Sequence, residues 1–418
     1  MEFGVRVCWA ENLTVFKRGD PLTRILVLDG HSSAALAITR SAGRAGYWVA
    51  VGANLNIFAA AKLSRYCRLG FDYPVSTNAP DAFVDAIVDF ARTHKIDLII
   101  PVTDWTLGPI SAARERFSGI SKLAIPSESA LQFSSDKFRT VELAQSIGIE
   151  VPKTAIVFDA NHPPPSRWNS FPVVVKDRYS VRWLNGKAVF GSVAYAYSEQ
   201  ELQSKATEQV EAAGDVLIQE FVHGVGIGFS CFVVGGKAFL PFQWKRIREV
   251  DPRGSGSSAR QSIALESGLL IRSVELVTKM GFEGIAMVEY KQTPDGRLIL
   301  MEVNGRPWGS IGLPIACGID YPLHLISWHL HGTPPLSQIP YRENVLCRRV
   351  LGELTHLSNV RAGRPRNWPG DYPRFWPTVF EMALPWRPGM CYDDLWISDP
   401  RPGLAGIRNF FGSRLSRR

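Results

Sequence analysis

Two glutamates face each other across a predicted hairpin turn in the second half of the chain. Residues 285–303 contain two apolar runs separated by Asp295-Gly296, a pair that favours a tight turn because both residues tolerate positive φ. A two-residue turn there places Glu289 directly opposite Glu302. Asn304 falls on the same face because side chains on a strand repeat every second residue.

This arrangement predicts a cation site. Like charges directly opposite each other destabilise a sheet, so two carboxylates and an amide oxygen on one face are expected to share a cation. Ligands that are all oxygen favour a hard ion, Mg²⁺ before Ca²⁺. The alternative that these residues leave open is a solvated acidic pair on an exposed hairpin.

The segment that follows the second glutamate resembles the metal-binding strand and loop of ATP-grasp ligases. The similarity covers residues 302–310 (EVNGRPWGS) and continues in residues 316–322 (ACGIDYP). The resemblance implies that Glu289, Glu302 and Asn304 hold Mg²⁺, or alternatively Mn²⁺, against the phosphates of ATP. It also implies that Arg306 stabilises the transferring phosphoryl group, in a reaction catalysed mainly by positioning and charge neutralisation.

Two lysines match phosphate-binding positions of this family. Lys137 begins a predicted helix that ends at Gly148, and Lys176 lies in the apolar strand 171–177. A lysine at the end of an apolar strand is costly to bury unless it meets an anion, and a phosphate is a suitable partner. We expect both lysines to bind the nucleotide and Lys176 to act in catalysis with Arg306. The alternative for Lys137 is a surface residue in the first turn of a helix.

Residues 216–222 resemble the family segment that meets adenine, largely through backbone groups. The expected nucleotide contacts are Gln219, Glu220, Phe221 and Val222. Two neighbouring segments depart from the family pattern. Residues 224–230 lack the acid that binds the ribose hydroxyls in many members. Residues 178–187 are basic and aromatic with one glycine, where many members have a Gly-rich lid whose amides cover the phosphates.

A basic cluster and a Gly/Ser-rich loop follow a predicted hairpin across Gly235-Gly236. Arginine forks and backbone amides of this kind suit an anion, and the resemblance places the region near the γ-phosphate and a substrate carboxylate. The candidates for substrate binding are Arg246, Arg248, Ser257 and Arg260. The alternative is a solvated basic loop.

Strands alternate with helices between residues 24 and 101, which predicts a parallel α/β sheet. The first strand-to-helix turn lacks a full Gly-x-Gly-x-x-Gly, so dinucleotide binding is not expected. The ATP-grasp resemblance instead implies a Rossmann-like domain before a two-lobed α+β ATP-grasp fold. The expected units are an N-terminal extension (1–22), the Rossmann-like domain (23–125), lobe 1 (126–215), lobe 2 (216–333) and a C-terminal extension (334–418) that begins with a helix at 341–357.

Polar residues after the first strands, including His31, Ser32 and Thr103-Asp104-Trp105, lie where α/β sheets bind ligands. Each is more easily explained as structural than as catalytic. The C-terminal extension is rich in Trp-Pro pairs, and its last stretch carries five arginines and no acid from Arg401 to Arg418. This end either contacts a membrane surface or a partner, or packs on the body as a charged tail.

The composition gives broader limits. The chain has 418 residues, a hydrophobic fraction of 45% and a net charge of +8, for which phosphate-binding residues are a sufficient explanation. Its six cysteines are scattered and form no Cys-x-x-Cys pair, and no apolar run reaches the roughly 20 residues that span a bilayer. We expect a cytoplasmic protein without nucleic acid as a partner.

The expected activity is an ADP-forming ligase that joins a carboxylate to an amine through an acylphosphate. Two alternatives remain, namely an ATP-grasp enzyme with a different acceptor and a non-catalytic, ATP-binding sensor or scaffold. The substrates are small molecules of unnamed identity, and a homodimer is the default assembly.

Overall fold

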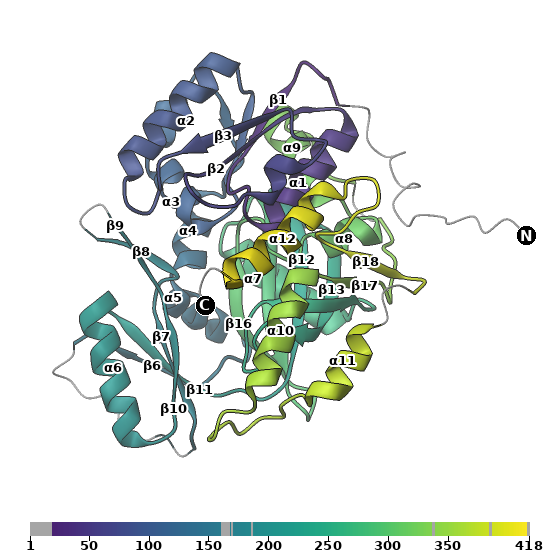
Figure 1. Cartoon of the computed structure of the whole chain (residues 1–418). Coiled ribbons are helices and arrows are strands. Elements are labelled where there is room, and N and C mark those ends of the chain that lie inside the picture. Colours follow the sequence, from purple (N-terminus) through teal and green to yellow (C-terminus); the bar gives the residue numbers. More distant parts are fainter. Residues whose placement is uncertain are drawn as a thin grey trace, which may run out of the picture.

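The protein is described by a computed structural model of residues 19–415, except residues 160–167, 169, 185–186, 337–338 and 384–386. Most of the predicted N-terminal extension, residues 1–18, lies outside the described residues. Three main sheets form the framework, with one sheet at the top of Figure 1, one at the lower left and one at the centre right.

The N-terminal sheet is parallel and has the strand order β3-β2-β1-β4-β5, which confirms the α/β prediction. Helices connect its strands in the usual crossover pattern. Its elements are β1 (Arg24–Val27), α1 (Ser33–Ala45), β2 (Trp48–Asn54), η2 (Ala60–Leu63), β3 (Leu69–Tyr73), α2 (Pro80–His94), β4 (Leu98–Ile100), α3 (Asp104–Ala112), η3 (Arg114–Phe117) and β5 (Lys122–Leu123).

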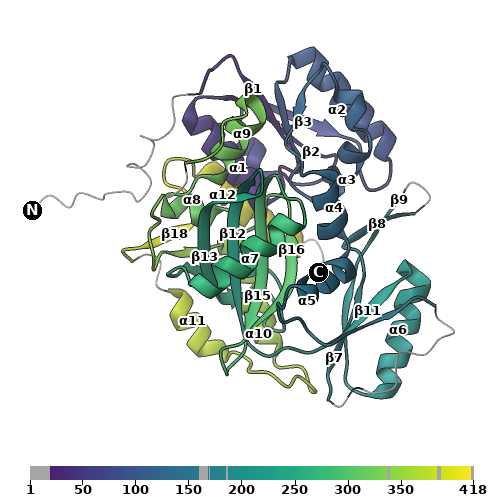
Figure 2. The same ribbon diagram turned by 180° about the vertical axis from the view of Figure 1, so that it is seen from behind.

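Two short helices lead to a four-stranded antiparallel sheet of order β10-β7-β11-β6. Asp136 caps the second helix by accepting hydrogen bonds from Phe138 N and Arg139 N, as the Ser-Asp-Lys start predicts. The elements are α4 (Glu128–Ser135), α5 (Lys137–Ser146), β6 (Thr154–Val157), β7 (Val173–Asp177), β10 (Val193–Ala196), α6 (Glu199–Ala213) and β11 (Val216–Glu220). A separate hairpin, β8 (Val181–Leu184) and β9 (Lys187–Phe190), projects from this sheet toward the N-terminal domain (Figures 1 and 2).

The largest sheet has seven strands in the order β16-β15-β12-β13-β14-β17-β18. Its last two strands come from the predicted C-terminal extension, so this extension continues the sheet. Helix α7 covers one face in Figure 2, and α10 and α11 cover the other in Figure 1. The elements are β12 (Val225–Val234), β13 (Lys237–Glu249), β14 (Ser257–Ser262), α7 (Ser267–Lys279), β15 (Gly284–Gln292), β16 (Leu298–Asn304), α8 (Gly312–Cys317), α9 (Tyr321–His331), β17 (Leu346–Arg348), α10 (Val350–Ala362), α11 (Phe375–Ala383), β18 (Met390–Tyr392) and α12 (Arg401–Leu415).

The hairpin of β15 and β16 keeps the predicted glutamate pair, but its turn is longer than predicted. Thr293 N donates to Arg297 O at 2.9 Å, which leaves three residues in the turn, and Gly296 takes φ 90° there. A three-residue turn alone would shift the register by one residue. A bulge at Met301 restores the register, so that Glu289 pairs with Glu302.

The helix predicted at 341–357 begins later than expected. Residues 346–348 form β17, which pairs with β14 and β18, and α10 begins at Val350. The apolar run was compatible with a short strand or with a helix, and pairing with a sheet edge decided in favour of the strand.

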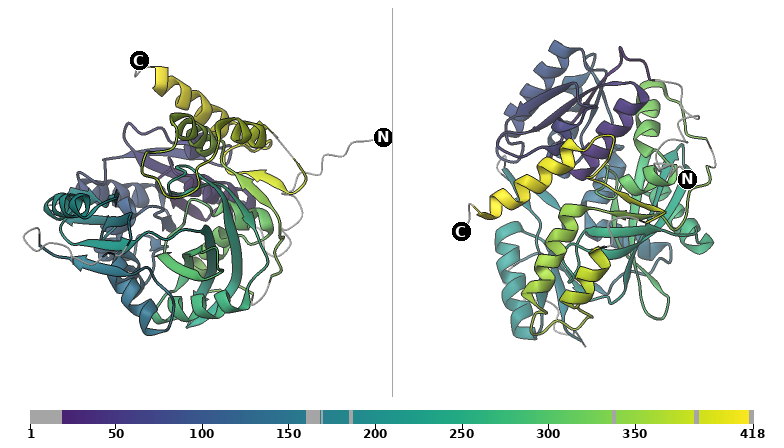
Figure 3. Two further views of the ribbon diagram at one scale, coloured as in Figure 1. Left: turned by 90° about the horizontal axis from the view of Figure 1, so that it is seen from below. Right: turned by 45° about the vertical axis from the view of Figure 1, so that its right-hand side comes forward.

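One hydrophobic core joins the N-terminal domain to the seven-stranded sheet. It includes Ile25 and Val51 from the first sheet together with Trp308 and Leu313 from the loop and helix after β16. The four-stranded sheet packs on α6 through a separate, smaller core. Figure 3 shows this smaller unit beside the main body. No described helix is both long and apolar enough to cross a membrane.

Candidate functional site

A cavity of about 470 Å³ lies between the four-stranded and the seven-stranded sheets. Strands β7 and β11 contribute from one side, strands β13, β15 and β16 from the other, and α5 from one end. Eleven of the predicted site residues line it: Lys137, Lys176, Gln219, Glu220, Phe221, Val222, Arg246, Glu289, Glu302, Asn304 and Arg306. Side chains from α5, from the four-stranded sheet and from the seven-stranded sheet therefore converge on one cavity.

The two carboxylates lie opposite each other on β15 and β16. Glu289 is paired with Glu302 and Met287 with Asn304 in the same register. Burial, reinforced by the charge of Glu289, raises the pKa of Glu302. A divalent cation would relieve this repulsion, and the carboxylate and amide oxygens form a donor set that fits Mg²⁺.

Two lysines approach this acidic end. Lys137 begins α5, directly after its cap, and its Nζ donates to Asp177 O at 3.3 Å. Lys176 lies on β7 with 8% of its surface exposed. Burial, together with the charge of Lys137, lowers the pKa of Lys176 to about 8. Two neighbouring positive charges that are largely shielded from water are unfavourable unless an anion binds beside them.

Arg306 is held by an aspartate from the N-terminal domain. Its Nε donates to Asp104 Oδ1 at 2.8 Å and its Nη2 donates to Asp104 Oδ2 at 2.7 Å. Asp104 is the first residue of α3. Although partial burial opposes its ionisation, the charge and hydrogen bonds of Arg306 lower the pKa of Asp104. The sequence placed Asp104 after a strand end but gave no sign of this partner.

The other end of the cavity is aromatic. Phe221 and Val222 follow β11, and Lys291 Nζ donates to Val222 O at 2.9 Å. The same Nζ lies 5.2 Å from the centroid of the Phe221 ring, within the range of a cation–π interaction. Sequence reasoning missed Lys291, although it lies two residues after Glu289 and thus on the same side of β15.

Arg246 occupies the middle of the cavity wall. Its guanidinium donates to Glu289, to Glu249 Oε1 at 3.1 Å and to Ser255 O at 2.7 Å. A Cβ on Gly226 would lie 2.5 Å from the Cδ of Arg246, so the glycine makes room for this side chain. Arg246 therefore reaches a metal-site carboxylate rather than standing free for a substrate.

Comparison with known proteins agrees with this geometry. A family model described as ATP-grasp in the biosynthetic pathway with Ter operon matches residues 215–350. A probable alpha-L-glutamate ligase of Vibrio parahaemolyticus is 26% identical over 220 residues, which cover 50% of this chain and 68% of the relative.

Solved structures extend the similarity beyond the matched segment. An L-amino acid ligase from Bacillus licheniformis aligns with a TM-score of 0.55 at 16% identity, over 76% of this chain and 75% of that one. An N5-carboxyaminoimidazole ribonucleotide synthetase in its ADP complex aligns with a TM-score of 0.58 at 14% identity, over 86% and 92%. Residues 215–350 therefore match an ATP-grasp family model, and the fold as a whole is similar to that of solved ATP-dependent ligases.

Three of the predicted substrate-binding residues lie away from the cavity. Arg260 is fully buried, and its Nη1 donates to Asp393 Oδ2 at 2.6 Å. Arg248 bonds to Glu353 and, through Nη2 at 3.0 Å, to Glu381 on the C-terminal helices. Both guanidinium groups pair with internal carboxylates, and neither lines the cavity as the prediction required.

Ser257 is the third of these residues. It begins β14, opposite Glu249, and does not line the cavity. The predicted Gly/Ser loop is correspondingly short, because Ser257 to Ser262 form a strand. Gly254, Ser255 and Gly256 are the loop residues that reach the cavity.

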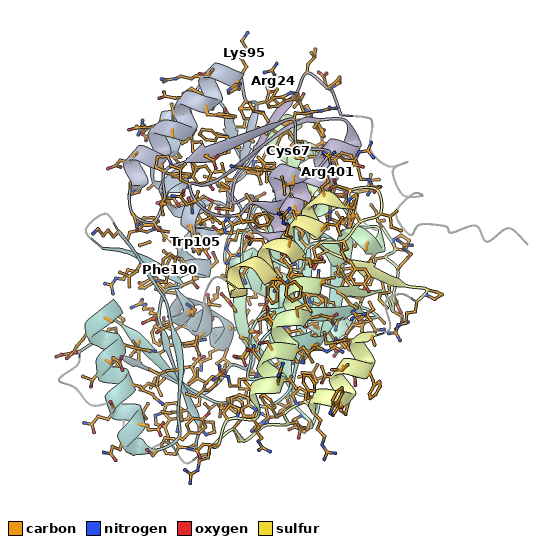
Figure 4. The ribbon with its side chains drawn as sticks, in the orientation of Figure 1. Arg24, Cys67, Lys95, Trp105, Phe190 and Arg401 are labelled. Carbon is orange, nitrogen blue, oxygen red and sulfur yellow. The ribbon has the colours of Figure 1, made fainter. Side chains whose placement is uncertain are left out.

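The segment that departs from the usual ATP-grasp lid is partly a β-hairpin that contacts the N-terminal domain. Ala188 N donates to Thr77 O at 2.8 Å, and the ring of Phe190 meets Trp105 edge-on at 5.3 Å. Trp105 in turn stacks on His31 at 5.4 Å. Figure 4 labels Trp105 and Phe190 where the hairpin meets the N-terminal domain. Residues 185–186 at its tip lie outside the described part.

A second cavity of about 830 Å³ adjoins the first beneath this hairpin. Both cavities share Glu302, Asn304 and Arg306. Helices α3 and α4 and the hairpin residue Trp183 supply the remaining walls. The end of strand β16 and the loop that follows it therefore separate two spaces, each large enough for a small ligand.

Proposed function

We propose that the protein is an ATP- and Mg²⁺-dependent ligase that joins a carboxylate to an amine and releases ADP and phosphate. The observation that supports it is the convergence of Lys137, Lys176, Glu289, Glu302 and Arg306 on one cavity. This set offers cations for phosphate oxygens and oxygen ligands for a metal. The ligase names of the similar proteins support the same class of reaction.

The nucleotide would lie along the cavity. Its base would meet Phe221 and Val222, and its phosphates would extend toward Lys137 and Lys176. Glu289, Glu302 and Asn304 would hold Mg²⁺, which supplies charge neutralisation on the phosphates when it is bound. Arg306 lines both cavities, so it is placed to offset charge on the γ-phosphoryl group as it moves from one space to the other.

In the proposed first step, an oxygen of the substrate carboxylate attacks the γ-phosphorus. The bond from that phosphorus to the bridging oxygen of ADP breaks, and an acylphosphate forms. In the second step, the amine attacks the acyl carbon, the C–O bond to phosphate breaks, and the amine proton leaves to solvent or to a base. The carboxylate and the amine would occupy the second cavity, next to Arg306.

The decisive experiment measures ADP release from Mg-ATP with pools of carboxylates and amines. L-glutamate is tested first, because a similar protein is named as a probable alpha-L-glutamate ligase. Glu302→Gln should abolish release, whereas Glu211→Gln on the exposed face of α6 should leave it unchanged. Hydroxylamine in place of the amine should give an acyl hydroxamate, because only an activated acyl group is trapped in this way.

Other outcomes would identify the alternatives. ADP release without hydroxamate would indicate phosphorylation of a different acceptor. Binding of Mg-ATP without turnover on every pool would favour a sensor or scaffold. A lack of ATP binding would contradict the proposal. A cytoplasmic location and a homodimer stay predictions, which fractionation and light scattering can test.

A further inference from the structure

The surface charge of the C-terminal helices is one-sided. Residues 350–412 contain seven exposed arginines but only two exposed acids, Asp371 and Glu381. The arginines are Arg361, Arg364, Arg366, Arg374, Arg387, Arg401 and Arg408. This excess does not appear in the sequence as a simple charge run, because the same segment also contains four further acids.

Those four acids are buried and are used inside the protein. Asp399 bonds Arg40 of α1, with Nε to Oδ2 at 2.9 Å, and Asp393 bonds Arg260. Glu353 accepts from Arg348 Nε at 2.6 Å, and Asp394 accepts from the amides at the start of α10. These four acids are therefore buried in the folded protein, whereas the arginines of the segment face solvent.

Large apolar side chains are exposed among these arginines. Trp376 and Phe380 lie one turn apart on α11 and are 66% and 72% exposed, the highest fractions of any Phe or Trp in the described part of the chain. Ile397, just before α12, is 83% exposed. Exposed apolar groups of this size are typical of an interaction surface, and the exposed charges of this segment are mostly arginines, with Glu381 beside Phe380 as one of two exposed acids.

Helix α12 also exposes apolar side chains together with arginines. Its small residues Gly403 and Gly406 face the body, where a Cβ on Gly403 would lie 2.6 Å from Asp394 O. The opposite side exposes Leu404 and Phe411, 59% and 51%, at positions that alternate with Arg401 and Arg408. The helix therefore buries Gly403 and Gly406 and exposes Leu404, Phe411, Arg401 and Arg408. Figure 4 labels Arg401 at the beginning of this helix.

We infer that α11 and α12 form a docking face for an anionic membrane surface. The arginines would bind lipid phosphates, and the Trp, Phe, Leu and Ile side chains would enter the interface. Aliphatic residues such as Ile397 and Leu404 favour lipid over nucleic acid, because they cannot stack on bases as aromatic rings do. Helices α10, α11 and α12 lie in one layer, as Figures 1 and 3 show.

This inference does not depend on the proposed ligase activity. The cavities lie between the sheets, and none of the exposed side chains named for the docking face lines the nucleotide cavity. Variants on the face are therefore expected to leave ATP binding unchanged, which separates the two tests.

The test is co-sedimentation of the full chain with vesicles of phosphatidylcholine alone or mixed with phosphatidylserine. The wild type should bind the mixed vesicles at least tenfold more tightly. Trp376→Ala with Phe380→Ala should weaken binding about tenfold. Arg401→Gln and Arg408→Gln should each weaken it about fivefold and should reduce its salt dependence.

Matched controls lie on α7, on the other face of the large sheet (Figure 2). Ile271, 66% exposed, and its exposed neighbour Arg272 can be changed to Ala and Gln. These variants should bind vesicles like the wild type, and all variants should keep the wild-type melting temperature. Equal binding to neutral and mixed vesicles would refute the proposal, as would retention on single-stranded RNA without any vesicle binding.

Discussion

Arg306 and Asp104 form a two-bonded ion pair across 202 residues of sequence, and this pair joins the loop after β16 to the first turn of α3. Bidentate pairing fixes both the position and the plane of a guanidinium group. The N-terminal domain therefore contributes to the site by orienting an arginine in the loop after β16.

Asp104→Asn is expected to lower kcat about 10- to 100-fold, because a misplaced transition-state contact is costly. The KM for ATP should change much less, because the lysines and the metal ligands remain. Steady-state kinetics measures both values. Asp85→Asn, which changes an exposed aspartate paired with Arg116, is the control and should have no effect. Equal losses in binding and turnover would argue against an orienting role.

The pKa of Lys176, lowered to about 8 by burial and by Lys137, predicts a pH dependence. The lysine is cationic below this pKa and neutral above it, so kcat/KM for ATP should fall as pH rises through about 8. Lys176→Arg should keep its charge and remove this fall, although the geometry of arginine can lower the overall rate. A profile that is flat from pH 7 to 9.5 in the wild type would contradict the prediction.

Arg260 is expected to stabilise the folded state. Arg260→Ala leaves Asp393 buried without its cation, which should cost about 3–5 kcal/mol of unfolding free energy. Chemical denaturation measures this loss. The control is Arg272→Ala on the surface of α7, which should leave the midpoint unchanged. A stable Arg260→Ala variant that has lost only substrate affinity would instead restore Arg260 as a binding residue.

The hairpin of β8 and β9 should loosen when its aromatic contact is removed. In Phe190→Ala the Ala188 amide, which donates to Thr77 O, should exchange with solvent about tenfold faster. Hydrogen exchange followed by mass spectrometry reports this directly. Exchange in β12 should be unaffected, since that strand is buried in the large sheet. Unchanged exchange at Ala188 would show that Phe190 does not hold the hairpin.

Much of the candidate site could be predicted because it depends on local periodicity. Glu289, Glu302 and Asn304 follow from strand alternation around one turn, and the pairing survived an error in turn length because the bulge at Met301 compensated for it. The resemblance to ATP-grasp enzymes points to Lys137 at a helix start and to Lys176 near a strand end, and their contact with phosphate stays a prediction. These features involve neighbours within one element or one hairpin.

The partners of Arg246, Arg260 and Arg306 could not be predicted in the same way. Arg260 and Asp393 are 133 residues apart, and no local pattern marks which arginine will meet an internal carboxylate and which will face a ligand. The sequence pattern predicts that all the arginines of the basic cluster bind one anion. The structure divides it, with Arg246 in the cavity and Arg260 in the core.

The sequence by itself determined the parallel N-terminal sheet and the hairpin that pairs Glu289 with Glu302, because hydrophobic period and turn chemistry act over a few residues. Only the tertiary structure decided that Asp104 orients Arg306, that Arg260 is buried with Asp393, and that four of the six acids in residues 350–412 are buried while the seven arginines there are exposed. The physical reason is that a charge in a folded protein is placed by the partner available at its position in space, and chain order does not specify that partner.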